Sequence, residues 1–359
     1  MLTVMQVLHQ GGGAGSVTST LYLSLGLARS GLTVRFVCPP NSEVEALARA
    51  GGLEVLPLAL QPHERRENAL KLRVMLERHP VDLVNSQSAR DREALTWLAM
   101  TRRLTIPFIA TRRQMPHTFP LENWIMSRLA ARVIAVSRAV GEALVRRGTP
   151  RSRLVVIPNG LVTERVDRPP TAERLEEWRR RIGWEPTRRV VGIVSRPKNQ
   201  DVVIRALRSI ATPIRLVLAG VDPSSDLANL GRRVPEQHTV VCIPFMPDVR
   251  PLYDLLELVL LPSSSEGLSQ ALLEAMALGK PVIASAATGN LEVITNGVDG
   301  RLIAPRDPQA WAEAIQQLLA DPVAAERLGN SARRTAREKF SLSLTIERTI
   351  RLYRAVLGR

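Results

Sequence analysis

Long apolar runs, cysteines and aromatic residues are all scarce in this chain of 359 residues. Apolar runs such as residues 258–261 are far shorter than the roughly 20 residues that span a bilayer. The 2 cysteines, Cys38 and Cys242, exclude a disulfide framework and are expected to be buried thiols. The first residues, MLTVMQVLHQGGG, contain no basic segment of the signal-peptide type. A cytoplasmic location is therefore expected.

Acidic residues are also in deficit, because 49 Lys and Arg stand against 34 Asp and Glu, for a net charge of +15. Such a charge attracts phosphate-bearing partners, namely nucleic acid, anionic lipid or a phosphorylated substrate, unless it only keeps the surface solvated. Aromatic residues make up only 4% of the chain, so base-stacking platforms are scarce. No nucleic-acid recognition module is visible, and nucleic acid is not expected as a partner.

Short β-branched runs alternate with helical stretches along the whole chain. The expected strands are residues 3–8, 33–38, 53–58, 81–85, 106–110, 132–137 and 153–158, then 189–195, 214–220, 239–244, 256–261, 281–286 and 300–305. This alternation predicts an α/β protein with parallel sheets wrapped by helices. The Pro-rich connector VDRPPT (166–171) interrupts the series, and the length suits two cores.

The prediction is therefore two Rossmann-like, doubly wound domains, at residues 1–166 and 167–340. The last helix, 341–359, is expected to pack back onto the first domain. Open parallel sheets bind ligands at the carboxyl ends of their strands, so the expected active site is a cleft that both domains face.

Residues 259–283, VLLPSSSEGLSQALLEAMALGKPVI, place a helix directly after a strand. The apolar positions with helical spacing are Leu268, Ala271, Leu272, Ala275 and Met276. The first backbone N–H groups of such a helix can hold an anion. Glu266 precedes the helix and Glu274 lies two turns into it, roughly 10 Å along its axis. Carboxylates accept hydrogen bonds from sugar hydroxyls, so the pair suits a ribose and a hexose. On spacing alone, a surface helix with two solvated glutamates is the alternative.

The segment EGLSQALLEAMALGKPVIAS resembles the E-x7-E signature of the family-four retaining glycosyltransferases of the GT-B fold. The resemblance implies that Glu266 contacts the donor sugar and that Glu274 holds the ribose. It also implies that the backbone of Gly267, Leu268 and Ser269 faces the diphosphate and the sugar. The implied reaction is hexosyl transfer from a UDP- or GDP-linked sugar to a glycan or lipid-linked acceptor, with retention of configuration.

Two loops extend this resemblance. The strand RVVGIVS ends in Arg196-Pro-Lys198-Asn199, where the family carries an Arg and a Lys for the donor diphosphate, although the loop between them is shorter here. Two cations there would stabilise the leaving group as a metal does. No metal or cofactor is expected, since no Asp-x-Asp motif or His/Cys cluster occurs. The loop HQGGGAGS (9–16) resembles the family's N-terminal Gly-rich loop, so Gly12, Gly13 and Ala14 are expected to meet the donor phosphate.

Segments 82–91 (DLVNSQSARD) and 110–116 (ATRRQMP) resemble a subgroup that builds bacterial surface polysaccharides. In that subgroup a His that contacts the donor often stands where this chain has Gln87 and Arg113. His9 and His117 are the nearby candidates to replace it.

The resemblance implies that residues 1–166 bind the acceptor and residues 167–340 bind the nucleotide-sugar donor. Arginines are dense within residues 102–153 of the first domain. They include Arg102, Arg103, Arg112, Arg113, Arg128, Arg132, Arg146, Arg147, Arg151 and Arg153. A basic domain of this kind is expected to dock peripherally on an anionic membrane at its inner face, unless the arginines are spread around the domain.

Two other functions remain open. A nucleotide-sugar epimerase of the same fold would bind the same donor. A non-catalytic polyanion- or polysaccharide-binding protein would account for the charge but leave the acidic motif without a role.

Overall fold

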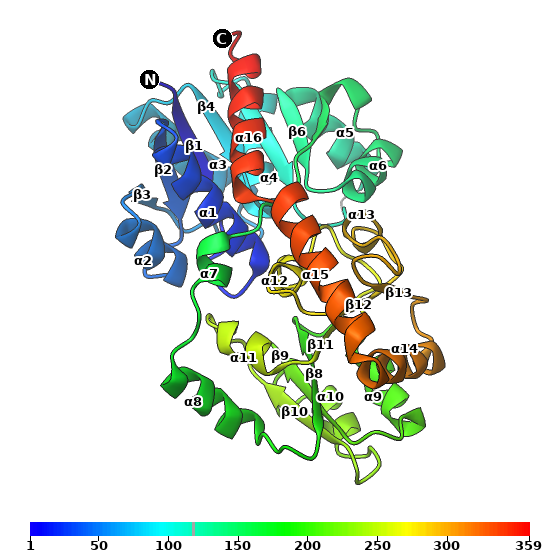
Figure 1. Cartoon of the computed structure of the whole chain (residues 1–359). Helices are drawn as coiled ribbons and strands as arrows, with labels where there is room; N and C mark the ends of the chain where they lie inside the picture. The colour runs from blue at the N-terminus through cyan, green and yellow to red at the C-terminus, as the bar shows by residue number, and fades with distance from the viewer. Residues whose placement is uncertain (117–118) are drawn as a thin grey trace. The chain divides into compact units, whose positions relative to one another are not determined.

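The computed structural model describes residues 1–116 and 119–359. This described chain divides into two units, each built around a parallel sheet (Figure 1). Unit 1 is Met1–Gly160 with Leu342–Arg359, and unit 2 is Leu161–Ser341. The boundary between the units falls after Gly160, before the predicted boundary at 166. Leu161 and Val166 are buried, and the Leu161 N–H donates to the Phe340 carbonyl of unit 2 at 2.6 Å. The connector 166–171 therefore lies inside unit 2.

Within the described residues, unit 1 holds a seven-stranded sheet in the order β3-β2-β1-β4-β5-β6-β7, with every pair parallel. Its strands are β1 (Thr3–Val7), β2 (Thr33–Cys38), β3 (Glu54–Pro57), β4 (Leu83–Ser86), β5 (Phe108–Arg112), β6 (Arg132–Ala135) and β7 (Leu154–Val156). Its helices are α1 (Gly15–Arg29), α2 (Glu43–Ala50), α3 (Arg65–Arg78), α4 (Ala89–Met100), α5 (Pro120–Leu129), α6 (Arg138–Arg146), the 3-10 turn η1 (Arg151–Arg153) and α16 (Leu342–Val356).

Unit 2 holds a parallel sheet in the order β10-β9-β8-β11-β12-β13. Its strands are β8 (Arg189–Val194), β9 (Ile214–Ala219), β10 (Thr239–Ile243), β11 (Leu258–Leu261), β12 (Val282–Ser285) and β13 (Arg301–Ile303). Its helices are α7 (Thr163–Asp167), α8 (Ala172–Ile182), α9 (Gln200–Ala206), η2 (Leu207–Ser209), α10 (Asp226–Gly231), α11 (Arg250–Leu255), α12 (Gln270–Ala277), α13 (Asn290–Val293), α14 (Pro308–Ala320) and α15 (Pro322–Lys339). This arrangement is the predicted fold class.

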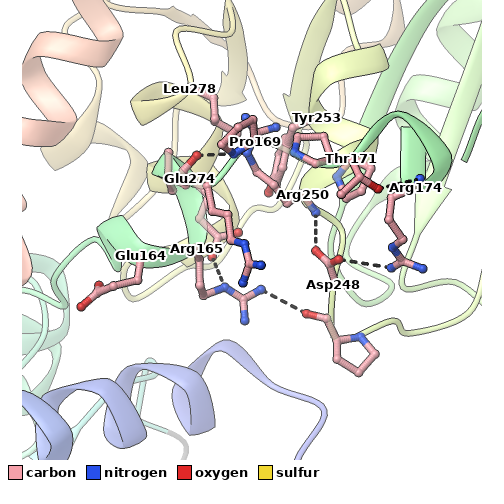
Figure 2. Close-up of a pocket in the computed structure, with 15 residues that line it drawn as sticks. Glu164, Arg165, Pro169, Thr171, Arg174, Asp248, Arg250, Tyr253, Glu274 and Leu278 are labelled. Carbon is pink, nitrogen blue, oxygen red and sulfur yellow. Dashed lines mark hydrogen bonds and ion pairs between the residues drawn. The ribbon is translucent and has the colours of Figure 1, made fainter. Parts of the chain in front are cut away.

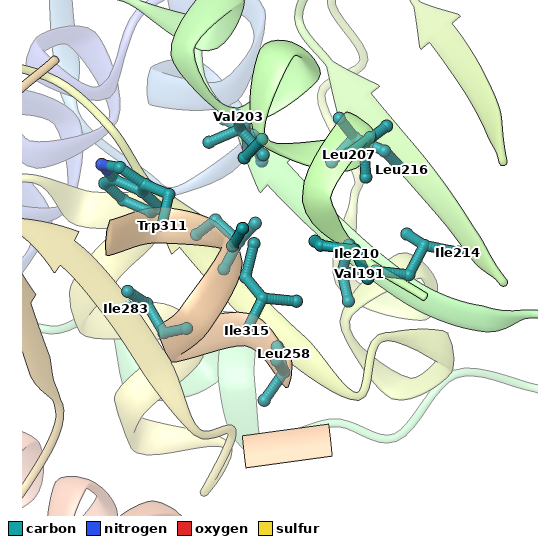
Figure 3. Packing of buried hydrophobic residues seen from close by; sticks show 14 of the residues in the cluster. Val191, Val203, Leu207, Ile210, Ile214, Leu216, Leu258, Ile283, Trp311 and Ile315 are labelled. Atoms are coloured by element: carbon teal, nitrogen blue, oxygen red, sulfur yellow. The ribbon is translucent and has the colours of Figure 1, made fainter. Parts of the chain in front are cut away.

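The unit 2 core shows why these strands read as continuous apolar runs. Sheet residues such as Leu216, Leu258 and Ile283 form one buried cluster with Trp311 and Ile315 of α14 (Figure 3). A strand buried on both faces needs apolar residues at successive positions, since helices cover both sides. Each fully buried side chain of this size stabilises the fold by roughly 1.5–3 kcal/mol.

The last helix of the chain, α16, is part of unit 1. The Tyr353 hydroxyl is buried and accepts hydrogen bonds from Gln6 Nε2 at 2.9 Å and Asn85 Nδ2 at 2.7 Å. Thr345 Oγ1 donates to the Pro158 carbonyl at 2.9 Å. These bonds tie α16 to β1, β4 and the segment that follows β7.

The sequence predicted two buried free thiols and no helix that crosses a membrane. Both cysteines are free thiols, but only Cys38 is buried, while Cys242 on β10 is partly exposed. Burial raises the pKa of the Cys38 thiol to about 12. In the part of the chain that the structure describes, no helix combines the length and apolarity needed to cross a bilayer.

In both sheets the strand order reverses at one point, between β1 and β4 in unit 1 and between β8 and β11 in unit 2. Ligands of doubly wound sheets bind beyond the carboxyl ends of the strands at such a reversal. The loops that follow β8 and β11 are those that carry Arg196, Lys198 and Glu266.

Candidate active site

The β8–β11 reversal in unit 2 brings two predicted residues into contact. Lys198 Nζ lies 2.8 Å from Glu266 Oε1, and Glu266 is only 8% exposed. Ser264 Oγ donates to Asn199 Oδ1 at 3.2 Å, which joins the same two loops a second time. A lysine and a buried glutamate, held together at a sheet edge, form a neutral pair that can share its hydrogen bonds with a polar ligand.

Arg196 stands on the same loop with its side chain exposed. Among the described residues nothing accepts a hydrogen bond from its guanidinium. The loop backbone is held by the buried Gln200, whose Nε2 donates to the Arg196 carbonyl at 2.8 Å and to Ser195 Oγ at 3.1 Å. Gln200 Oε1 also accepts from the Lys198 N–H. The arrangement leaves the Arg196 charge available on a fixed backbone.

The loop after β12 supports Glu266 from the other side. The Glu266 N–H donates to Thr288 Oγ1 at 2.8 Å, and the Gly289 N–H donates to the Glu266 carbonyl at 3.2 Å. A Cβ atom at position 289 would lie 2.1 Å from the Gly267 carbonyl oxygen. Only glycine fits there, because no side chain tolerates so close an approach to backbone.

Helix α12 begins at Gln270, after the Ser-rich loop that follows β11. Ser269 is its N-cap, with Oγ accepting from the Leu272 N–H at 3.3 Å. The sequence predicted a helix buried along one apolar face only. In the structure nearly all of α12 is buried, including Glu274. Helix α15 packs on α12 from the side that a surface helix would expose to water.

Glu274 lines a cavity of about 370 Å³ that lies within unit 2, whereas Glu266 does not line it (Figure 2). Arg165 Nε lies 3.2 Å from Glu274 Oε1, and Arg165 Nη2 donates to the Pro247 carbonyl at 3.2 Å. Burial raises the pKa of Glu274, while Arg165 and the Tyr253 hydroxyl act to lower it. The result is a buried carboxylate with a cation beside it, at the wall of an open space.

Charged side chains on the cavity's outer part are largely paired with one another. Arg174 Nη2 lies 3.2 Å from Asp248 Oδ2, and Arg250 Nη1 lies 2.5 Å from Asp254 Oδ1. Figure 2 shows Arg174, Asp248 and Arg250 apart from Glu274 and Arg165. The acidic motif residue and its arginine therefore form a local pair of their own.

The predicted glycine-rich loop lies in unit 1, between β1 and α1. Gly13 has φ = +71° with nothing within 4 Å of a built Cβ, and Ala14 is the N-cap of α1. A Cβ at Gly12 would lie 2.8 Å from Glu43 Oε2. This loop follows β1, at the β1–β4 reversal of unit 1.

Of the two histidines that were candidates for the donor contact, the structure describes only His9. His9 Nδ1 lies 2.5 Å from Ser88 Oγ and 3.2 Å from Asp91 Oδ1, so its ring is fixed inside unit 1. His117 lies outside the described residues.

At the positions where a histidine often stands, Gln87 Oε1 accepts from Arg113 Nη2 at 2.7 Å. Arg113 also bonds to Asn159 Oδ1. Burial lowers the pKa of Arg113 to about 10. These positions therefore carry an amide and a guanidinium bound to each other.

Sequence reasoning missed several residues that shape this site: Arg165, Gln200, Tyr253, Thr288 and Gly289. Only Gln200 could have been suspected from the sequence, because it directly follows Asn199 in the loop after β8. Among the residues described, no three His, Cys, Asp or Glu side chains gather as a metal-binding group.

Two family models match the chain. The one described as glycosyl transferases group 1 matches residues 176–335, and the one described as Glycosyltransferase Family 4 matches residues 13–165. A glycosyltransferase of Methanocaldococcus jannaschii is 29% identical over 237 residues, covering 64% of this chain and 61% of that protein. A D-inositol 3-phosphate glycosyltransferase of Mycobacterium marinum is 30% identical over 228 residues, covering 60% of this chain and 47% of that protein. The matched parts span about half to three fifths of these relatives.

Solved structures resemble the whole chain. The Anabaena protein Alr3699/HepE in complex with UDP-glucose has a TM-score of 0.84 at 20% identity, covering 99% of this chain and 100% of that one. Sucrose-phosphate synthase from Thermosynechococcus elongatus has a TM-score of 0.79 at 20% identity, with full coverage of both chains. At this identity the likeness establishes the fold. Because one family model matches within each half of the chain, and the fold agrees, the chain belongs to the family-four-type glycosyltransferases of the GT-B fold.

Proposed function

We propose that the protein transfers a hexosyl unit from a nucleotide-sugar to a hydroxyl of a glycan or lipid-linked acceptor, with retention of configuration and without a metal. The observation that carries this proposal is the Lys198–Glu266 pair at the β8–β11 reversal, beside the unengaged Arg196. A diphosphate needs cations and a sugar needs acceptors for its hydroxyls, and this edge offers both.

The chemistry assigned to each group follows from its charge. Arg196 and Lys198 neutralise the diphosphate as the bond between the sugar's C1 and the phosphate oxygen breaks. Glu266 accepts hydrogen bonds from the sugar's hydroxyls and stabilises its positive, oxocarbenium-like state. The acceptor oxygen then bonds to C1 on the face that the leaving group vacates, and its proton passes to the departing phosphate oxygen. The Gly267–Ser269 backbone and the Gly12–Ala14 loop contribute hydrogen bonds to the donor.

Glu274 holds the ribose in this proposal. Its buried carboxylate, with Arg165 on Oε1, has acceptor capacity left for ribose hydroxyls in the adjoining cavity. A UDP-linked donor is favoured by the UDP-glucose complex of the Anabaena relative. An acceptor in the assembly of a surface polysaccharide agrees with the sequence resemblance described above.

The test is a transfer assay on membranes or extracted glycans with labelled nucleotide-sugars. Glu266→Gln should lower turnover strongly, and Glu326→Gln, on the exposed face of α15, should leave it unchanged. Addition of EDTA should have no effect. Donor conversion without any acceptor would indicate an epimerase instead. Tight, salt-sensitive polymer binding without turnover would indicate a binding protein.

We also propose that unit 1 docks on an anionic bilayer through α5. Large apolar side chains of α5 face solvent, with Leu121 67% and Trp124 45% exposed, while the buried side holds Asn123, Met126 and Ser127. Arg128 lies over the Trp124 ring at 5.4 Å. Exposed Trp and Arg side by side suit a lipid headgroup region. Leu121→Ser with Trp124→Ser should abolish co-sedimentation with anionic vesicles, and unchanged co-sedimentation would contradict the docking role.

A further inference from the structure

Not all of the arginines of residues 102–153 are on the surface. Arg112, the last residue of β5, is only 5% exposed. In the described part of the chain, no hydrogen-bond acceptor or carboxylate lies against its guanidinium. A guanidinium stays charged in a protein, and burying it without a partner is costly. The site that Arg112 occupies is therefore electrostatically incomplete.

A second buried arginine lies at the same sheet edge. Ser86 of β4 pairs with Ala110 of β5, so Arg112 extends past that pair to the level of Ser88, the N-cap of α4. Arg92, at the start of α4, is 9% exposed and donates from Nη1 to the Ser88 carbonyl at 2.9 Å. Arg92 and Arg112 therefore share the β4–β5 edge.

Burial lowers the pKa of Arg92, while Asp91 and Glu93 act to raise it, whereas the charges that act on Arg112 are both arginines. Asp91 Oδ2 accepts from the Gln87 N–H at 2.6 Å and the Ser88 N–H at 2.8 Å, while Oδ1 bonds to Ser88 Oγ and His9. Its carboxylate is thus committed to capping α4. Arg147, the C-cap of α6, adds positive charge: burial, Arg92 and Arg147 together lower the pKa of Arg112 to about 9.

We propose that Arg112 and Arg92, with Arg147 nearby, form a binding site for a phosphate ester carried by the acceptor. The edge lies at the carboxyl ends of parallel strands, where such sheets bind ligands. Guanidinium groups bind phosphate through two parallel hydrogen bonds, and a bound oxyanion supplies the negative charge that the fold omits. The identification of the phosphate with the acceptor rests on the proposed transferase function; the anion site itself does not.

The test uses thermal unfolding of the full chain in phosphate-free buffer, titrated with inorganic phosphate at constant ionic strength. Phosphate should raise the Tm of the wild type in a saturable manner. Arg112→Met should unfold at a higher Tm than the wild type without phosphate, because it removes an uncompensated buried charge, and should not respond to phosphate. Arg151→Gln, on the exposed η1, is the matched control and should respond as the wild type does.

Equal loss of stability in Arg112→Met with and without phosphate would overturn the proposal, since it would mean a structural role only. An unchanged phosphate response in Arg112→Met, or none in the wild type, would overturn it as well. Should Arg112→Met fail to fold, Arg112→Lys keeps the charge and should weaken the response, because lysine lacks the two-bond geometry.

Two further experiments identify the source of the phosphate and distinguish the phosphate site from the proposed donor site. Glycerol 3-phosphate tests a soluble ester and phosphatidic acid vesicles test a lipid; Arg112-dependent binding of either supports the site, and Arg112-independent binding of both overturns it. Nucleotide-sugars should still stabilise Arg112→Met. If nucleotide-sugars stabilise neither the wild type nor any variant, the proposed donor is wrong. The phosphate response would still test the Arg112 site.

Discussion

The two sheets share one strand order, but charged side chains near the carboxyl ends of their strands are paired differently. In unit 2, cations and carboxylates are paired, Lys198 with Glu266 and Arg165 with Glu274. At the β4–β5 edge of unit 1, Arg112 has no partner among the described residues, and Arg113 is held only by neutral amides.

This difference indicates different ligands for the two edges. A paired edge presents both donors and acceptors, which suits a sugar with many hydroxyls attached to a diphosphate. A buried guanidinium without a partner, such as that of Arg112, suits a group that is purely an acceptor. Since topology is the same in both units, the division of roles depends on a few side chains at the ends of strands.

The largest expected effect comes from Arg196, the unengaged cation of the paired edge. Arg196→Ala should lower kcat/KM by roughly 10²–10³-fold, about 2–4 kcal/mol, because the charge developing on the diphosphate loses a preorganised partner. Steady-state kinetics measure this. Arg208→Ala, an exposed arginine of η2, is the control and should behave as the wild type. A loss below threefold in Arg196→Ala would remove it from the proposed mechanism.

Glycine substitutions compare how closely the backbone is packed in the loops of the two units. Gly289→Ala should cost roughly 1–3 kcal/mol of unfolding free energy and lower turnover, since the Cβ would force the Gly267 backbone away. Gly13→Ala, with φ = +71° but open space around it, should cost only about 1 kcal/mol. Urea denaturation measures both. A cost at Gly13 equal to or above that at Gly289 would contradict the described packing.

The smallest effect concerns the ion pair itself. In a double-mutant cycle, Lys198→Met and Glu266→Gln should couple by about 1 kcal/mol in stability, because Lys198 is partly exposed to water. Additive effects would contradict a stabilising interaction between the two side chains.

The sequence predicts the fold well because its evidence is local. Every expected strand overlaps one observed strand, and α12 begins directly after the Ser-rich loop. Apolar periodicity and turn residues are properties of short segments, which is why they can be read from the sequence. Arg112 could have been found too: Phe108, Ala110 and Arg112 alternate on one face of β5, so the arginine continues a buried face.

The supporting contacts of the site could not be predicted this way. Arg165 reaches Glu274 across more than a hundred residues of chain, and Thr288 and Gly289 reach Glu266 from the loop after β12. No local pattern encodes such contacts, because they depend on how strands are ordered in the sheet. The E-x7-E resemblance names the two acids but not the residues that hold them.

The central claim, that the two acids divide the donor between them, is tested most directly by nucleotide binding. Wild type, Glu266→Gln and Glu274→Gln would be titrated with UDP, GDP, ADP and their sugar conjugates in a thermal-shift or calorimetric assay. At 100 times its dissociation constant a true donor should stabilise the wild type by about 2.7 kcal/mol. Glu274→Gln should weaken free nucleotide and nucleotide-sugar alike, while Glu266→Gln should weaken only the sugar conjugate. Equal losses for free nucleotide in both variants, or none in either, would contradict the account.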